Sequence, residues 1–261
     1  MNFLRSIVIM LSLYTKIPMP FIEWDGENRK NVLTVLSLAG AVAGLFEAAW
    51  AWLAFFLDFK AAFYAAGACL IPALVTGGIH MDGLSDTEDA RASHAGPERR
   101  QQILADPHMG AFGALAIVLY ELFCFALYWT IYDSGASGLD FSLPWMLFAV
   151  FTASRAMAQL GIATIKPARD EGMLYTFSSV TNKPAMIAVS LAVLASCVLI
   201  LVWVQGLPAL LCGAALVLLF LYFRHMAVRE FGGISGDLCG WIIEMTIPVM
   251  LTAAAVAIRL V

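Results

Sequence analysis

The sequence predicts an all-α integral membrane protein, a polytopic bundle of about seven transmembrane helices with a short N-terminal helix that is interfacial or re-entrant. Two observations on composition support this fold class. Apolar residues make up 61% of the 261 residues and charged residues 13%, whereas soluble domains average about 45–50% and about 25%. The mean hydropathy is +0.84. This composition excludes a disordered chain, and the net charge of −4 indicates no nucleic-acid partner.

The third observation is the arrangement of the apolar residues, because seven stretches are long enough to cross a bilayer. They lie near residues 32–57, 61–77, 111–132, 144–165, 185–204, 208–223 and 240–258. Gly40, Gly44 and Gly67 in the first two stretches favour close contact between helices. An earlier stretch, 3–17, is shorter and contains two basic residues, so it either lies in the interface or re-enters the membrane. We expect one membrane-embedded domain over residues 1–261.

Basic residues are distributed unevenly among the segments that connect these stretches. Twelve of the 15 Lys and Arg residues precede the first stretch or lie in segments 78–110, 166–184 and 224–239. The other connections contain two, Lys60 and Arg259. Cytoplasmic segments of membrane proteins carry such an excess. We therefore expect the richer side to face the cytoplasm and, after seven crossings, the C-terminus to lie outside.

The most informative acids lie where the second stretch reaches the basic side, in residues 77–90, GGIHMDGLSDTEDA. Asp82, Asp86 and Asp89 are spaced i, i+4 and i+7, so on a helix their directions lie within about 60° of one another. Three like charges on one face repel each other unless a cation neutralises them, and hard oxygen ligands suit Mg²⁺ or Mn²⁺. The alternative is a solvated acidic helix end. Glu88 lies off this face and is expected to be solvated.

A second acidic group lies just before and inside the last stretch. Residues 231–237, FGGISGD, are glycine-rich and include Gly233 and Asp237. Glu244 follows Asp237 by seven residues and shares its helix face. A carboxylate inside a membrane helix is costly and usually faces a polar interior or a partner. The alternatives are a simple turn for the glycine-rich segment and a hydrogen bond to a neighbouring helix for Glu244.

Basic groups that could bind a diphosphate come from the middle of the chain. Arg155 lies halfway along the fourth stretch, and Lys166 and Arg169 follow at its polar end. Such cations beside a metal–carboxylate site are what a diphosphate substrate requires. The alternatives are a buried ion pair of Arg155 with Glu121 or Glu47, and ordinary flanking charge for the other two.

Two further residues each have two interpretations. Asp106 is a candidate ligand with His108 as a proton acceptor, or Asp106-Pro107 only starts a turn before the third stretch. His80 is a general base or, as we favour, a side chain that supports the acidic helix. The five cysteines are dispersed, so we expect neither a disulfide nor a zinc framework.

Together these residues resemble the cobalamin synthase family, the adenosylcobinamide-GDP ribazoletransferases, over most of the chain. The family's motifs T-R-L-P-x-P, GG-x-H-L-D-G-L-x-D-T-x-D-G, D-x-x-x-G-x-x-G and GG-x-T-G-D…E are similar to residues 15–20, 77–90, 106–116 and 232–244. Ser154-Arg155 and residues 168–173 match the middle of the family's sequence. Three positions depart from the pattern, since Met81, Ala90 and Ser235 replace Leu, Gly and Thr, but none removes a carboxylate.

The resemblance implies a reaction and a site. A ribose hydroxyl of α-ribazole or α-ribazole 5′-phosphate attacks the phosphorus that carries the cobinamide of adenosylcobinamide-GDP. GMP leaves, and adenosylcobalamin or its 5′-phosphate forms. The metal is expected to be Mg²⁺, with Mn²⁺ as a substitute, held by Asp82, Asp86 and Asp89 together with Asp237. Either Asp86 or Asp89 would take the proton, and the looser relatives of the motif favour Asp89. Substrate contacts are expected from His80, Asp106, Arg155, Lys166, Arg169, Gly233 and Glu244.

The resemblance also implies a setting. The expected location is the cytoplasmic (inner) membrane of a prokaryote, with the lipid bilayer as a partner and the active site facing the cytoplasm. A homo-oligomer, or association with other cobalamin-assembly enzymes, is a further expectation.

Two other functions fit part of the pattern. The acidic motif more loosely resembles that of the CDP-alcohol phosphotransferases, but Leu84-Ser85 stand where those enzymes carry Ala-Arg. A cation-coupled transporter would use Arg155 and the acids inside the spans. Its acidic site should lie near the bilayer midplane, whereas most acids of this chain lie at the boundary.

Overall fold

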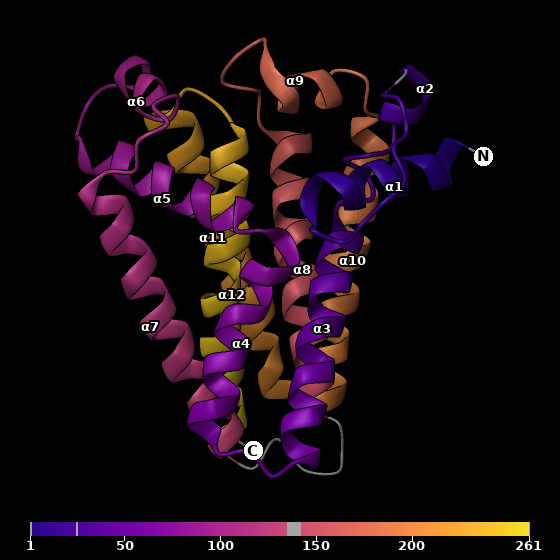
Figure 1. The fold of residues 1–261 in the computed structure, drawn as a ribbon, viewed down its shortest axis with the longest axis vertical. Coiled ribbons are helices and arrows are strands. Elements are labelled where there is room, and N and C mark those ends of the chain that lie inside the picture. Colours follow the sequence, from indigo (N-terminus) through magenta and orange to yellow (C-terminus); the bar gives the residue numbers. More distant parts are fainter. Residues whose placement is uncertain (1, 25, 135–141, 261) are drawn as a thin grey trace.

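The computed structural model describes residues 2–24, 26–134 and 142–260, and over these residues it is helical with no β-strand (Figure 1). The long helices form a bundle and are α3 (Ser37–Phe56), α4 (Ala61–Thr76), α7 (Ala111–Asp133), α8 (Ser142–Thr164), α10 (Lys183–Gln205), α11 (Leu210–Glu230) and α12 (Gly236–Ile258). A 3₁₀ turn, η1 (Leu207–Ala209), precedes α11. The shorter helices gather at one end of the bundle and are α1 (Asn2–Tyr14), α2 (Gly26–Arg29), α5 (Ile79–Ala92), α6 (Pro97–Ile103) and α9 (Gly172–Ser178).

The predicted membrane bundle is confirmed. Six helices in the described part of the chain are long and apolar enough to cross a membrane, and there are seven if α4 and α5 count as one bent span. The first span begins at Ser37 rather than near residue 32, because residues 31–36 form hydrogen-bonded turns. The shorter N-terminal stretch is a helix of 13 residues, α1.

Helix α8 is the centre of the bundle and is buried along almost its whole length. It packs against α3, α10 and α12. A Cβ on Gly40 would collide with the backbone of α8, and a Cβ on Gly44 would lie 2.9 Å from the Cα of Phe148. Gly67 likewise leaves room for the indole of Trp50. The three glycines therefore permit close helix contact, as predicted.

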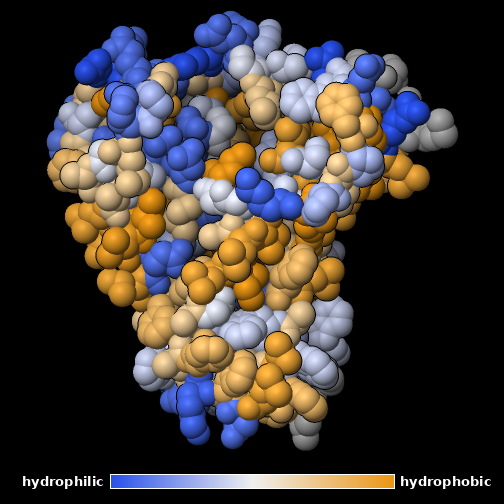
Figure 2. Space-filling model, in the orientation of Figure 1, coloured by the Kyte–Doolittle hydropathy of each residue, from blue (hydrophilic) through white to orange (hydrophobic). Residues whose placement is uncertain are grey.

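The outer surface of the bundle is apolar over its middle and polar at its ends (Figure 2). Large apolar side chains point outward from α10 and α11, among them Leu199, Trp203 and Leu218 at 67%, 74% and 68% exposed. A soluble monomer rarely exposes so much contiguous apolar surface. The surface suits contact with lipid tails, in agreement with the predicted bilayer partner.

A sharp turn between α4 and α5 positions the acidic helix. Gly77 and Gly78 both adopt the left-handed conformation, with φ of +70° and +80°, which glycine adopts without steric cost. The two helices meet at 97°, so α5 lies across the polar end of the bundle instead of continuing through it. Its five charged residues thereby stay outside the apolar layer.

The polar connections lie together. α1, α2, α5, α6 and α9 occupy the same end of the bundle, and α12 ends at the opposite one (Figure 1). The prediction that the N-terminal segment and the basic connections share one side is therefore confirmed.

Candidate active site

The acidic helix is seated on α12 by two glycines that face each other. A Cβ on Gly83 would lie 2.7 Å from the carbonyl oxygen of Asp237 and 3.1 Å from the Cα of Gly240. A Cβ on Gly240 would lie 2.8 Å from the carbonyl oxygen of His80. Only glycine permits the two backbones to approach this closely. The contact brings the acids of α5 beside Asp237, although the two groups are about 150 residues apart in sequence.

Four carboxylates lie close enough for their charges to interact. Asp86 is half-buried, and its pKa is raised to about 6, first by burial and then by the charges of Asp82, Asp237 and Asp89. Asp82 is exposed, and within the described residues neither its carboxylate nor that of Asp86 has a hydrogen-bond partner. The structure thus brings together the four acids that the sequence grouped.

These carboxylates are near one another but are not preassembled around one point. Among the described residues, no three Asp, Glu, His or Cys side chains are placed so that they could hold a metal ion. The four carboxylates still suit a hard divalent cation, because such ions prefer oxygen ligands. A bound cation would also relieve the repulsion between Asp86 and the neighbouring carboxylates. Binding would need the side chains of Asp82, Asp86 and Asp237 to turn toward a common centre.

The repulsion at Asp86 predicts a pH dependence of stability. Its folded-state pKa of about 6 exceeds the ordinary value of 3.8, so between these values the folded protein binds more protons than the unfolded chain. The free energy of unfolding therefore falls as the pH rises through this window. In thermal unfolding without metal we expect a higher midpoint at pH 5 than at pH 7.5, and a larger stabilisation by Mg²⁺ at pH 7.5. Asp86→Asn should flatten the profile, and an unchanged profile in that variant would contradict the assignment.

Asp89 joins α5 to the beginning of α7. Its two carboxylate oxygens accept hydrogen bonds from the backbone N–H groups of Gly110 at 2.7 Å and Gly113 at 2.8 Å. The first backbone N–H groups of a helix have no partner within the helix, and these bonds satisfy two of them at the N-terminus of α7. The helix dipole favours a negative charge at this terminus. A Cβ on Gly110 would lie 2.8 Å from the Asp89 carboxyl carbon, and one on Gly113 would lie 2.8 Å from the Ser85 carbonyl oxygen. The sequence grouped Asp89 with the other acids but did not predict this contact.

We expect Gly110→Ala to weaken the junction of α5 and α7. The methyl group would displace the Asp89 carboxylate and cost about 1–3 kcal/mol of stability, and turnover should fall with it. Gly96→Ala is a matched control, because Gly96 occupies the same position before α6 and its Cβ would meet only Glu98 Oε2, at 3.7 Å. Thermal unfolding of the two variants tests this, and equal midpoints would contradict it.

A buried polar cluster around Arg155 of α8 lies beneath α5. The guanidinium donates to Ser154 Oγ at 2.9 Å and lies 3.3 Å from Nδ1 of His80. Glu244 of α12 accepts a hydrogen bond from the Tyr120 hydroxyl at 2.6 Å, and its charge acts on Arg155. Arg155, His80 and Glu244 are all buried. Their position favours a role in supporting α5 from below.

The structure differs from the ion-pair alternatives for Arg155 and from the prediction for Glu88. Arg155 forms no ion pair with Glu47 or Glu121 among the described residues, and the carboxylate whose charge acts on it is Glu244. The prediction that Glu88 is solvated is wrong. Glu88 is half-buried and accepts a hydrogen bond from Trp241 Nε1 at 2.6 Å. Spacing on α5 placed it off the acidic face correctly, but could not show that α12 supplies a partner.

The N-terminal segment secures the α4–α5 turn, which sequence reasoning missed. The ring of Tyr14 stacks on His80 with centroids 6.2 Å apart. The backbone N–H of Lys16 donates to the Val75 carbonyl at 2.7 Å. A Cβ on Gly77 would lie 3.1 Å from the Cγ of Lys16, so the lysine side chain lies over the turn. The only signal for this contact was the similarity of residues 15–20 to a family motif.

The segment after α8 pairs with the glycine-rich segment before α12. The Ile234 N–H donates to the Lys166 carbonyl at 2.8 Å, and the Ala168 N–H donates to the Ile234 carbonyl at 2.9 Å. A Cβ on Gly233 would lie 2.6 Å from the Lys166 carbonyl oxygen. Ile234 therefore joins the two segments through backbone hydrogen bonds to Lys166 and Ala168, and Gly233 leaves room for this contact. The Lys166 side chain is exposed.

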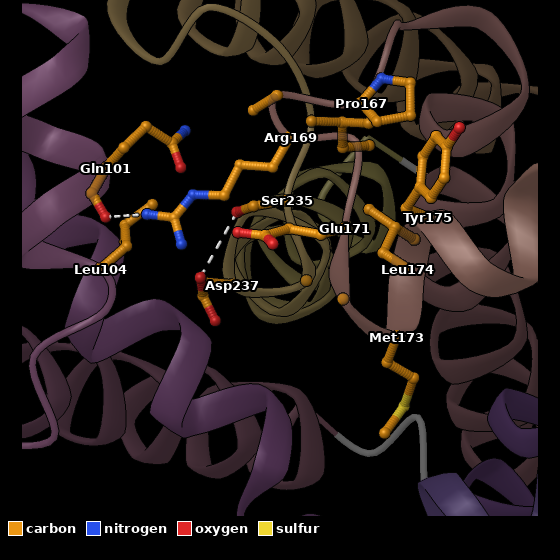
Figure 3. A pocket seen from close by; sticks show the side chains of 14 residues that line it. Gln101, Leu104, Pro167, Arg169, Glu171, Met173, Leu174, Tyr175, Ser235 and Asp237 are labelled. Atoms are coloured by element: carbon orange, nitrogen blue, oxygen red, sulfur yellow. Dashed lines mark hydrogen bonds between the residues drawn. The ribbon is translucent and has the colours of Figure 1, made fainter.

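A cavity of about 210 Å³ lies between these segments and opens beside Asp237 (Figure 3). Arg169 reaches across it, donates to the carbonyl oxygen of Gln101, and interacts with the charge of Asp237. Asp237 thus belongs both to this cavity and to the group of four acids. The cavity and the acids therefore adjoin at Asp237.

The contacts of Asp106 support the second alternative, in which Asp106-Pro107 starts a turn before α7. The Asp106 carboxylate lies 2.7 Å from His108 Nδ1 and accepts the His108 backbone N–H at 3.0 Å. These hydrogen bonds lower the pKa of Asp106, and both side chains are largely exposed. Asp106 therefore shapes the connection into α7, and a substrate contact from it stays a prediction.

Comparison with known proteins finds matches over most of the chain. A model of the cobalamin-5-phosphate synthase family matches residues 6–255. An adenosylcobinamide-GDP ribazoletransferase of Lachnoclostridium phytofermentans is 31% identical over 249 residues, covering 92% of this chain and 89% of that protein. Proteins of the same name from Clostridium perfringens strain SM101 and Listeria welshimeri are both 29% identical, over 93% and 91% of this chain. No solved structure matches the chain. The matched residues include every segment that meets at the polar end.

Proposed function

The chain belongs to the cobalamin-5-phosphate synthase family, and from that membership we propose how its polar end performs the family's reaction. The relatives are named for the transfer of ribazole to adenosylcobinamide-GDP. The function is that transfer, in the assembly of the nucleotide loop of cobalamin. The observation that carries the proposed site is the convergence of Asp82, Asp86, Asp89 and Asp237 beside the Arg169 cavity.

We propose that Asp82, Asp86 and Asp237 hold Mg²⁺, with Mn²⁺ as a substitute, and that Asp89 completes the acidic group. The bound cation would neutralise the charge that develops on phosphate oxygens as GMP departs. Arg169, next to Asp237, binds the diphosphate directly. Lys16 extends over the α4–α5 turn and is a second cation for the same substrate. Arg155 and Glu244 act from below by holding α5 in place.

Proton removal from the attacking ribose hydroxyl needs a carboxylate oxygen that is not already engaged. Both oxygens of Asp89 accept backbone hydrogen bonds, whereas Asp86 has no partner among the described residues. The sequence resemblance favours Asp89 as the base. The contacts favour Asp86, so we propose that one of its carboxylate oxygens holds the cation and the other accepts the proton, while Asp89 fixes α5 against α7.

We place the polar end in the cytoplasm. The excess of basic residues in its connecting segments supports this orientation. A cysteine introduced at Arg99, in exposed α6, should be labelled by an impermeant thiol reagent in inverted membrane vesicles but not in intact cells, and the opposite result would reverse the orientation.

The direct test uses the purified protein in detergent with adenosylcobinamide-GDP and α-ribazole. We expect stoichiometric release of GMP and formation of adenosylcobalamin in the presence of Mg²⁺, and loss of both on chelation. Activity without a sealed compartment would set aside transport as the function, and CDP-linked lipids should not replace the donor. Absence of GMP release would contradict the proposed reaction, and release that chelation leaves unchanged would contradict the metal.

A further inference from the structure

The cavity beside Asp237 has an apolar wall that remains exposed. Met173 and Tyr175 line it and are 52% and 36% exposed, although they lie at the polar end of the bundle. Leu174 extends this wall, and Leu104 lies on the opposite side of the cavity beside Gln101 (Figure 3). Apolar and aromatic side chains around a concave site, with few polar groups among them, are typical of a site for a planar ligand.

Two charged side chains line the cavity from the segment between α8 and α9. Arg169 interacts with the charge of Asp237 and so joins the cavity to the acids. Glu171 reaches into the same space from the start of α9 (Figure 3), and within the described residues its carboxylate has no hydrogen-bond or ion-pair partner. A free carboxylate can only accept hydrogen bonds. A ligand that pairs with Glu171 must therefore present N–H or O–H donors.

The size of the cavity restricts the ligand. A volume of about 210 Å³ is below the roughly 300–1,000 Å³ of sites for drug-sized ligands. This accommodates a heterocycle of two fused rings and is far too small for a corrin. Three such heterocycles take part in the reaction. The benzimidazole of ribazole has no N–H donor, and the adenine of the adenosyl group has an amino donor beside a ring nitrogen, N1, that can only accept. Guanine has two adjacent donors, the ring N1–H and the exocyclic amino group.

We propose that this cavity binds the guanine base of the donor, with Glu171 accepting its N1–H and amino hydrogens. The base then lies between the apolar wall and α12, and its diphosphate extends past Arg169 to the acids. The inference rests on the proposed function, because it assumes that the acids hold the diphosphate of a guanosine nucleotide. It adds the residue that selects the base.

The test compares the binding of GMP, IMP and XMP to purified protein in lipid nanodiscs by calorimetry. The three bases differ at C2, and xanthine also carries a hydrogen at N3. IMP lacks the amino group, and XMP carries a carbonyl there that Glu171 would repel. We expect GMP to bind about tenfold or more tightly than either, since a bidentate pair discriminates by about that factor. In Glu171→Gln the amide can donate to the xanthine carbonyl, so XMP should bind more tightly than GMP. Glu171→Asp should weaken GMP but keep the wild-type order.

Asp170→Asn is the matched control, since Asp170 is adjacent and exposed but does not line the cavity. It should keep the wild-type order of the three nucleotides. A Glu171→Gln protein that unfolds at the normal temperature and still prefers GMP would overturn the inference, as would a wild type that does not distinguish GMP from IMP. Turnover of adenosylcobinamide-GDP in the same preparation separates the two proposals. If turnover is normal but Glu171 does not determine which nucleotide binds, only this inference is overturned. If there is no turnover, the proposed function is overturned.

Discussion

Replacing Asp86 with asparagine is expected to lower the turnover of ribazole transfer by about a thousandfold. The side chain keeps its shape and loses its charge, so both metal binding and proton acceptance at this position are removed. Asp82→Asn should show a related but distinguishable defect. It removes a ligand and leaves the proposed base, so higher Mg²⁺ should restore part of its turnover. GMP release measured over a range of Mg²⁺ concentrations distinguishes the two variants.

The control is Asp58→Asn, at the opposite end of the bundle between α3 and α4. Asp58 has a φ of +52°, a conformation that asparagine also tolerates, so the substitution changes one charge without straining the backbone. Its turnover should match the wild type. Near-normal turnover of both Asp82→Asn and Asp86→Asn at limiting Mg²⁺ would show that the metal is held elsewhere.

The predictions from sequence that proved correct rest on patterns within single helices and on the distribution of charge between the two sides of the bilayer. The apolar stretches gave the spans, and the i, i+4, i+7 spacing grouped Asp82, Asp86 and Asp89, whose charges do interact in the structure. The distribution of basic residues placed the polar connections on one side. These features depend on the geometry of a single helix or on the bilayer, so they can be predicted before the packing is known.

The features that the sequence did not predict depend on which helices meet. Spacing could not show that Asp89 caps α7 or that Glu88 is bonded to Trp241, because each partner lies on another element. The 97° turn was also missed, since an apolar stretch followed by an acidic one is compatible with a straight helix. The role that we propose for Glu171 depends on the cavity that residues 167–169, 171–175 and 234–237 line together.

Replacing Gly83 with alanine is expected to abolish most activity without touching a charged group. The added Cβ would lie 2.7 Å from the Asp237 carbonyl oxygen and 3.1 Å from the Gly240 Cα. Both are backbone atoms, so neither can rotate away and α5 must move off α12. This separates Asp82 and Asp86 from Asp237. A displacement of about 1 Å at a reacting centre costs about a hundredfold in rate, and the overpacking costs about 1–3 kcal/mol of stability.

Gly213→Ala provides the comparison for a glycine inside a membrane helix. Its Cβ would meet the Val198 methyl groups at 3.5 and 3.6 Å, which is ordinary contact, so its turnover and unfolding midpoint should stay near the wild-type values. Gly240→Ala should reproduce the defect of Gly83→Ala, because its Cβ would press on the His80 carbonyl oxygen from the other side of the same crossing. Combining the two should cost less than the sum of the separate effects, since the first methyl already holds the helices apart. Full additivity would mean that the two glycines act independently, and that the crossing of α5 over α12 does not set the distance between the acids.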